Sequence, residues 1–180
     1  MKRHLLFLVF ILFFFSVNAQ NGFRRSFNLG LQYDGIALNY DCRFKKNQQW
    51  GYNLGFAFGY AQSSSLFGSL ESLRSYSVPM GMSYLVWPKK HTLEVGLGQV
   101  IGLYNQHYNK IELVDENYDF ILKKSNQILQ YFYGNVGYRY TANRGFQFRL
   151  GLTPVLALMG GKNTNKGFMM GAYITFGKAF

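Results

Sequence analysis

Apolar and polar residues alternate along most of the chain, which is the periodicity of β-strands with two different faces. The clearest case is residues 50–60. One face of this segment carries Trp50, Tyr52, Leu54, Phe56, Phe58 and Tyr60, while the other carries only Gly51, Asn53, Gly55, Ala57 and Gly59. A strand that faces water would need a more polar side, so this pattern predicts large side chains against lipid and small ones inside a narrow barrel.

The same alternation predicts eight strands. They span residues 27–33, 36–44, 50–60, 76–85, 92–103, 131–140, 146–156 and 168–180. Asp34-Gly35 has the composition of a two-residue hairpin turn. The other connections alternate between short polar turns and long loops, of which residues 104–130 are the longest. We therefore predict an all-β fold, an eight-stranded antiparallel up-and-down transmembrane β-barrel.

Composition supports this prediction. Aromatic residues make up 19% of the sequence, yet its mean hydropathy is only −0.08, because apolar residues alternate with polar ones. Residues 1–19 have the pattern of a cleaved signal peptide, with a basic start, an apolar run over residues 5–15 and small residues before Gln20. Residues 20–180 then form the barrel domain, and none of their apolar runs reaches the roughly 18 residues of a transmembrane helix.

With these eight alternating segments, the chain resembles the small eight-stranded outer-membrane β-barrels of Gram-negative bacteria, of the OmpA-transmembrane or OmpX type. The resemblance covers residues 20–180. It implies a location in the cell outer membrane, with both termini and the short turns in the periplasm and the long loops outside.

Barrels of this family also share a carboxy-terminal insertion signal. Gly171, Ile174 and Phe176 match its spacing, and Phe180 supplies a terminal aromatic residue. The match lies four residues before the end, and Lys178 stands where the family has an apolar residue. The resemblance implies that the barrel assembly machinery is a partner during insertion.

The formal charge is +11, and it becomes +9 once Lys2 and Arg3 leave with the signal peptide. Most basic residues lie in pairs at the predicted turns, so no continuous basic face suited to nucleic acid is predicted. The lysines of the long loops could pair with phosphates of lipid and glycolipid in the outer membrane. They are Lys110, Lys123, Lys124, Lys162 and Lys166.

Five charged residues fall on the inward faces of the predicted strands. They are Asp41, Arg43, Glu94, Arg139 and Arg149. An eight-stranded barrel is just filled by its side chains, and buried charges must be paired. We therefore predict an ion network in the lumen, centred on Glu94 and Arg139. It could act as a gate whose pairing switches, or simply as charge compensation.

Catalysis has little support in the sequence. The one credible base for lipid chemistry is His107. A nucleophile–base–orienter set could be drawn from it, from serines of the preceding loop and from downstream acidic residues, but no fixed spacing connects them. The serines are Ser63, Ser64 and Ser65, and the acidic residues are Glu112, Asp115, Glu116 and Asp119. The sequence contains no glycine-rich phosphate loop and no Cys/His cluster, so it predicts neither a cofactor nor a metal.

We therefore expect a non-enzymatic outer-membrane barrel with a structural or loop-mediated role, such as envelope integrity, adhesion or assistance to secretion. One alternative is an outer-leaflet lipid-modifying enzyme that uses His107. Another is a soluble ligand-binding β-barrel, although the large apolar outer faces argue against it.

Overall fold

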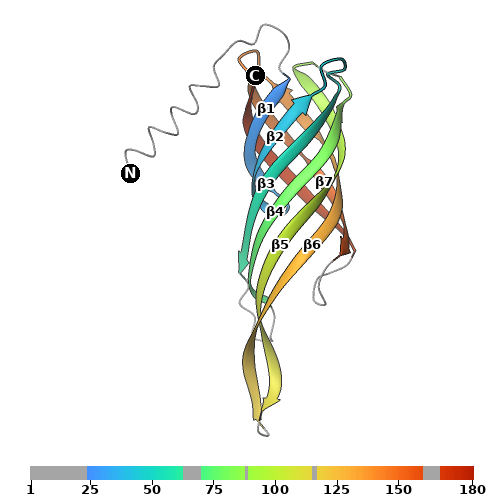
Figure 1. The fold of residues 1–180 in the computed structure, drawn as a ribbon. Coiled ribbons are helices and arrows are strands. Elements are labelled where there is room, and N and C mark those ends of the chain that lie inside the picture. The colour runs from blue at the N-terminus through green and yellow to red at the C-terminus, as the bar shows by residue number, and fades with distance from the viewer. Residues whose placement is uncertain (1–23, 63–69, 88, 115–116, 160–166) are drawn as a thin grey trace, which may run out of the picture.

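The protein is a closed antiparallel barrel of eight strands in which each strand pairs with the next and β8 returns to β1 (Figure 1). The computed structural model describes residues 24–62, 70–87, 89–114, 117–159 and 167–180, so the predicted signal peptide lies outside it. The strands are β1 (Arg25–Gln32), β2 (Gly35–Arg43), β3 (Trp50–Gln62), β4 (Leu70–Leu85), β5 (His91–Val114), β6 (Asn117–Thr141), β7 (Phe146–Met159) and β8 (Phe168–Ala179). The predicted fold class is confirmed.

The two ends of the barrel differ. One end, here called the turn end, carries the start of β1, the end of β8 and the turns at residues 44–49, 86–90 and 142–145 (Figure 1). The opposite end, called the loop end, carries the connections after β3, β5 and β7. Within the described residues, no helix has the length and apolar character needed to span a bilayer.

The barrel is polar inside and apolar outside. Among the described residues, sixteen buried side chains are polar or charged and only eight are hydrophobic, the reverse of a water-soluble core. The six large side chains of β3 are 39–55% exposed, as the alternation predicts. This continuous outward apolar surface is stable in lipid and would aggregate in water, which excludes the soluble-barrel alternative on physical grounds.

One predicted loop is wrong. Residues 104–130 are mostly strand, because β5 and β6 remain paired from His91↔Tyr140 to Val114↔Asn117. These strands have 24 and 25 residues, more than twice the roughly 9–11 that span a bilayer, and their hairpin projects beyond the barrel (Figure 1). The sequence there shows no clear alternation of apolar and polar residues, although the backbone pairing continues to the end of the hairpin.

The tight turn between β1 and β2 reaches across the lumen. Asp34 accepts hydrogen bonds from Ser77 on β4 and from Tyr131 on β6, the latter at 3.4 Å. The ring of Tyr33 lies edge-on to that of Tyr131, with centroids 5.4 Å apart. Tyr131 also packs with Val100 and Val155 in the apolar cluster of the lumen. The one short connection toward the loop end therefore serves to fill the barrel.

This turn depends on Gly35, whose φ of 127° is rarely adopted by other residues. A Cβ there would lie only 2.6 Å from the Cα of Gly59. We expect Gly35→Ala to lower the free energy of unfolding by about 1–3 kcal/mol, measured by urea unfolding in phospholipid vesicles. The control Gly134→Ala places a Cβ 3.3 Å from Pro154 Cγ and should cost about 0.5 kcal/mol or less. Equal losses in the two variants would contradict the proposed strain.

Candidate functional site: an ion network in the lumen

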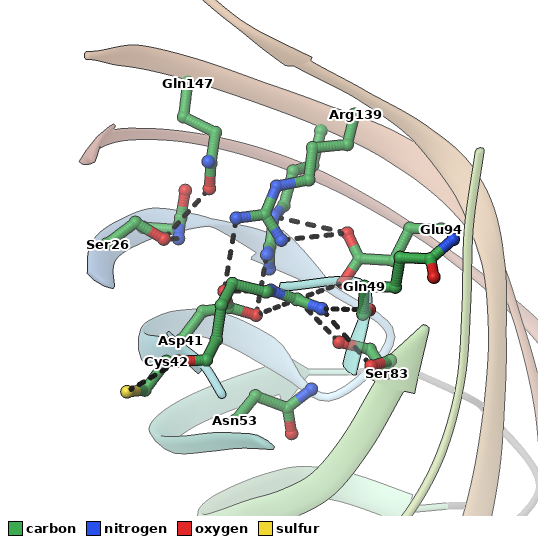
Figure 2. Close-up of polar contacts among 12 residues, drawn as sticks. Ser26, Asp41, Cys42, Gln49, Asn53, Ser83, Glu94, Arg139 and Gln147 are labelled. Atoms are coloured by element: carbon green, nitrogen blue, oxygen red, sulfur yellow. Dashed lines mark hydrogen bonds and ion pairs between the residues drawn. The ribbon is translucent and has the colours of Figure 1, made fainter. Parts of the chain in front are cut away.

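The five charged residues predicted for the lumen lie together near the turn end. Figure 2 shows three of them, Asp41, Glu94 and Arg139. Asp41 and Arg43 come from β2, and the other three from β5, β6 and β7. Each is at most 7% exposed. Every arginine lies within 4 Å of both carboxylates, so the cluster contains six ion pairs. The strand periodicity brings these residues together because all five occupy inward positions.

Asp41 is the centre of the cluster. Its Oδ1 accepts hydrogen bonds from Arg43 Nε at 3.0 Å and Arg139 Nη2 at 3.2 Å. Its Oδ2 accepts from Arg43 Nη2 at 2.6 Å and Arg149 Nη2 at 2.9 Å. A carboxylate offers about four acceptor sites, so this one is fully used. Such charge-assisted bonds are stronger than neutral ones.

Glu94 is held more loosely than the sequence suggested. Its nearest contacts with the arginines are 3.4–3.7 Å long, and neither of its buried oxygens has a hydrogen-bond partner. The register explains this difference, because Glu94 stands opposite Gly137 while Arg139 stands opposite Thr92. Glu94 and Arg139 therefore meet diagonally, and the predicted centre of the network shifts to Asp41.

Arg43 fixes the cluster to the barrel wall. Its Nη1 donates to the carbonyl oxygens of Gln49 and Ser83, both at 3.2 Å, and its Nη2 also donates to Ser83 Oγ at 2.7 Å. With the bonds to Asp41, all five N–H groups of this guanidinium are occupied. Arg43 therefore has no hydrogen-bond donor left for a switching motion.

A second polar layer continues the network toward the turn end. Ser26 donates to Gln147 at 3.0 Å and accepts from Asn28 at 2.9 Å, while Gln147 donates to Thr141 at 3.2 Å. This layer was not predicted from the sequence. Small polar residues are common in strands with alternating faces, so these residues do not stand out in the sequence. Only their inward position indicates that they form one layer.

Toward the loop end, the network borders a small polar cavity of about 50 Å³. Arg149, Asn135 and Tyr173 are among its lining residues. The ring of Tyr173 lies over Gly151, where a Cβ would come within 2.7 Å of it. A larger residue at position 151 would collide with this ring and with the backbone of Val136 and Gly137, so glycine fits here. Such a cavity has room for about three to five waters.

Of the candidate catalytic residues, the structure describes the side chain of His107 alone. His107 Nε2 is buried without a hydrogen-bond partner, and His107 stands between Ser72 and Lys124 in the sheet. The serines proposed as nucleophiles, Ser63 to Ser65, lie outside the described residues. The side chains of Glu112, Asp115, Glu116 and Asp119 are likewise not described. Within the described part of the chain, no group of three or more His, Cys, Asp or Glu could hold a metal.

The residues of the predicted insertion signal lie on β8 and at the terminus after it. Phe176 faces outward, 50% exposed, with its ring 5.2 Å from that of Phe148. Phe180 stacks on Phe27 at 5.9 Å and exchanges two backbone hydrogen bonds with Arg25. Lys178, the departure from the family pattern, donates to the carbonyl oxygen of Arg144 at 2.8 Å. Gly171 and Ile174 complete the set on the same strand.

The fold of the chain is similar to that of solved outer-membrane barrels. The chain is similar to Ail, the attachment invasion locus protein of Yersinia pestis, with a TM-score of 0.52, 14% identity and coverage of 88% of this chain and 99% of Ail. Ail in complex with the heparin analogue sucrose octasulfate gives the same TM-score and identity, covering 89% and 100% of the two chains.

The amino-terminal barrel domain of Pseudomonas aeruginosa OprF is 15% identical, with a TM-score of 0.42 and coverage of 89% and 99%. No protein-family model and no curated protein sequence matches the chain. The fold and the lipid-facing surface together are those of an integral outer-membrane β-barrel.

The geometry predicts unequal roles for the two carboxylates. Asp41→Asn leaves three buried arginines with one carboxylate, so we expect the free energy of unfolding to fall by about 3–5 kcal/mol. Glu94→Gln removes only the longer contacts and should cost roughly 1–3 kcal/mol. The control Asp34→Asn keeps an acceptor for Ser77 and Tyr131 and should cost about 1 kcal/mol or less. Urea unfolding in vesicles measures all three, and a larger loss for Glu94→Gln would contradict this ranking.

Proposed function

We propose that this chain is a non-enzymatic integral protein of the outer membrane, with a sealed lumen, that acts through its loop end or as part of the envelope structure. The observation that carries this proposal is the lumen, which is filled at two levels by different chemistry. Solute transport needs a continuous path through the barrel, and the described residues block that path at both levels.

The seal has an ionic part and an aromatic part. Near the turn end, Asp41 and Glu94 bind the guanidinium groups of three strands across the barrel. Further along, the rings of Tyr33 and Tyr131 meet across the lumen. The hydroxyl oxygen of Tyr104 lies 3.3 Å from that of Tyr131. The cavity between these levels is about 50 Å³, too small for most solutes. We therefore favour charge compensation over a gate as the role of the network.

The projecting hairpin of β5 and β6 supports a loop-mediated role. Both strands continue past the last residues paired with their other neighbours, Leu70↔Tyr108 on one side and Gln130↔Met159 on the other. A two-stranded element that extends beyond the rest of the barrel can contact the cell surface or a partner. Adhesion, envelope integrity and assistance to secretion are the roles that suit it.

Polyanion binding at the loop end is not part of this proposal, although Ail has been solved with a heparin analogue. The loop-end segments carry nearly equal numbers of acidic and basic residues. The acidic ones are Glu71, Glu112, Asp115, Glu116 and Asp119, and the basic ones are Arg74, Lys110, Lys123, Lys124, Lys162 and Lys166. A nearly balanced surface gives little electrostatic attraction for a sulfated polymer. Scattered pairing of these lysines with glycolipid phosphates remains part of the proposal.

The second candidate, a lipid-modifying enzyme with His107 as base, has only the buried imidazole nitrogen in its favour. The mass spectrum of lipid A from cells with and without the protein distinguishes the two candidates, since an altered acyl pattern requires the enzyme.

A sealed lumen predicts the absence of channels. In planar lipid bilayers, we expect neither the wild-type protein nor Glu94→Gln to produce conductance steps, because Asp41 and the Tyr33 contact still block the path in both. Folded protein, identified by its heat-modifiable gel mobility, is used throughout. Steps in the wild type would overturn the sealed lumen, and steps in Glu94→Gln alone would favour the gate.

Export and insertion complete the proposal. Residues 1–19 would direct export and be cleaved, and the aromatic residues Phe176 and Phe180 would present β8 to the barrel assembly machinery. We expect the double variant Phe176→Ala/Phe180→Ala to reduce the amount of folded barrel in the outer membrane several-fold. The matched control Phe146→Ala/Phe168→Ala removes two other exposed aromatics. Unchanged insertion of the first variant would refute the insertion signal without affecting the fold.

A further inference from the structure

Most of the net positive charge of the chain lies at the turn end. Eight basic residues lie in its turns and in the adjoining strand ends, namely Arg24, Arg25, Lys45, Lys46, Lys89, Lys90, Arg144 and Lys178. No acidic side chain accompanies them outside the ion network. The loop-end segments are nearly balanced, so the turn end has a strong positive field that the loop end lacks.

A hollow of about 260 Å³, here called the vestibule, lies at this end. The buried Arg43 and Arg139 line it, together with the exposed Lys89 and Lys90 from the turn before β5. Asn143 and Gln147 add neutral hydrogen-bonding groups, and none of the lining residues is acidic. Four cationic side chains therefore surround one hollow, two of them inside the barrel and two at its surface.

The buried part of this site has an unmatched charge. Three arginines share two carboxylates, and the next carboxylate along the lumen, Asp34, bonds to Ser77 and Tyr131 instead. Arg139 lines the vestibule, and its Nη1 makes no hydrogen bond, only a 3.7 Å ion pair with Glu94. A buried charge without a full set of partners is costly, so an anion beside Arg139 would stabilise the cluster.

We propose that the vestibule binds a phosphate-class oxyanion. Guanidinium and ammonium groups are the usual partners of phosphate. Arg139 offers its unused Nη1 donors and the two lysines offer ammonium groups, whereas Arg43, whose N–H groups are all occupied, contributes charge alone. Four cationic groups around the hollow favour a multiply charged anion over a single carboxylate. The volume is many times the roughly 10–15 Å³ that one water needs on the same measure, so the hollow has room for a phosphate or pyrophosphate group. The anion comes either from free phosphate or from a phospholipid headgroup in the facing leaflet.

The test uses two lysine pairs in short turns of the same end. Lys89 and Lys90 line the vestibule, whereas Lys45 and Lys46 are exposed and do not. The variants Lys89→Ala/Lys90→Ala and Lys45→Ala/Lys46→Ala remove the same charge from the same end. Binding of inorganic pyrophosphate to the folded full chain in zwitterionic detergent is measured by calorimetry at constant ionic strength. We expect the first variant to lose affinity about tenfold or more and the second less than about threefold.

A second experiment, with lipids, identifies the source of the anion. The retention of phosphatidylglycerol is compared with that of phosphatidylcholine for the same variants by native mass spectrometry. Pyrophosphate binding that needs Lys89 and Lys90 supports a soluble anion, and phosphatidylglycerol retention that needs them supports a headgroup. The proposal is overturned if neither anion binds, or if both variants lose binding equally. Restoration of binding by Lys89→Arg/Lys90→Arg would show that charge, and not the turn's shape, is recognised.

Discussion

The pairing of β1 with β8 closes the barrel, and the rest of the structure depends on that closure. Hydrocarbon offers no hydrogen bonds to an open sheet edge, so every strand must pair on both sides within the membrane. The seam runs from Ser26↔Ala179 to Leu31↔Ile174 and is extended by two backbone bonds between Arg25 and Phe180, 2.8 and 3.1 Å long. Closure with eight strands leaves an interior only as wide as its side chains. Each inward residue must therefore fit a narrow space, in which a polar group without a partner, such as the carboxylate oxygens of Glu94, is costly.

Two different chemistries meet this demand at two depths. Near the turn end, long arginine side chains reach the axis and converge on Asp41, which is tolerable because the charges are paired and bonded to the wall. Further toward the loop end the filling is aromatic, and it depends on the unequal lengths of the strands. Because β1 and β2 have only 8 and 9 residues, their turn lies within the length of the barrel, and Tyr33 enters the lumen.

Alternation predicted the strands and their faces wherever the two faces of a strand meet different surroundings, as at residues 50–60. The prediction failed at residues 104–130, where the sequence shows no clear alternation although both strands continue and remain paired. The members of the ion network followed from charge and inward position. Its centre did not, because whether Asp41 or Glu94 lies closest to the arginines depends on a register that places Glu94 opposite Gly137. This register is visible only in the three-dimensional structure.

Charge is the property for which composition alone is most misleading. A chain of formal charge +11 suggests a cationic protein that attracts polyanions from any side. Its fold divides that charge into a nearly neutral loop end, a lumen with paired ions and a strongly basic turn end. If the turn end faces the periplasm, as the family resemblance implies, the attraction is directed toward the inner leaflet and periplasmic anions, away from the cell surface. Recognition outside the cell would then rest on the shape and hydrogen-bonding groups of the projecting hairpin, because net charge there is too small to select a partner.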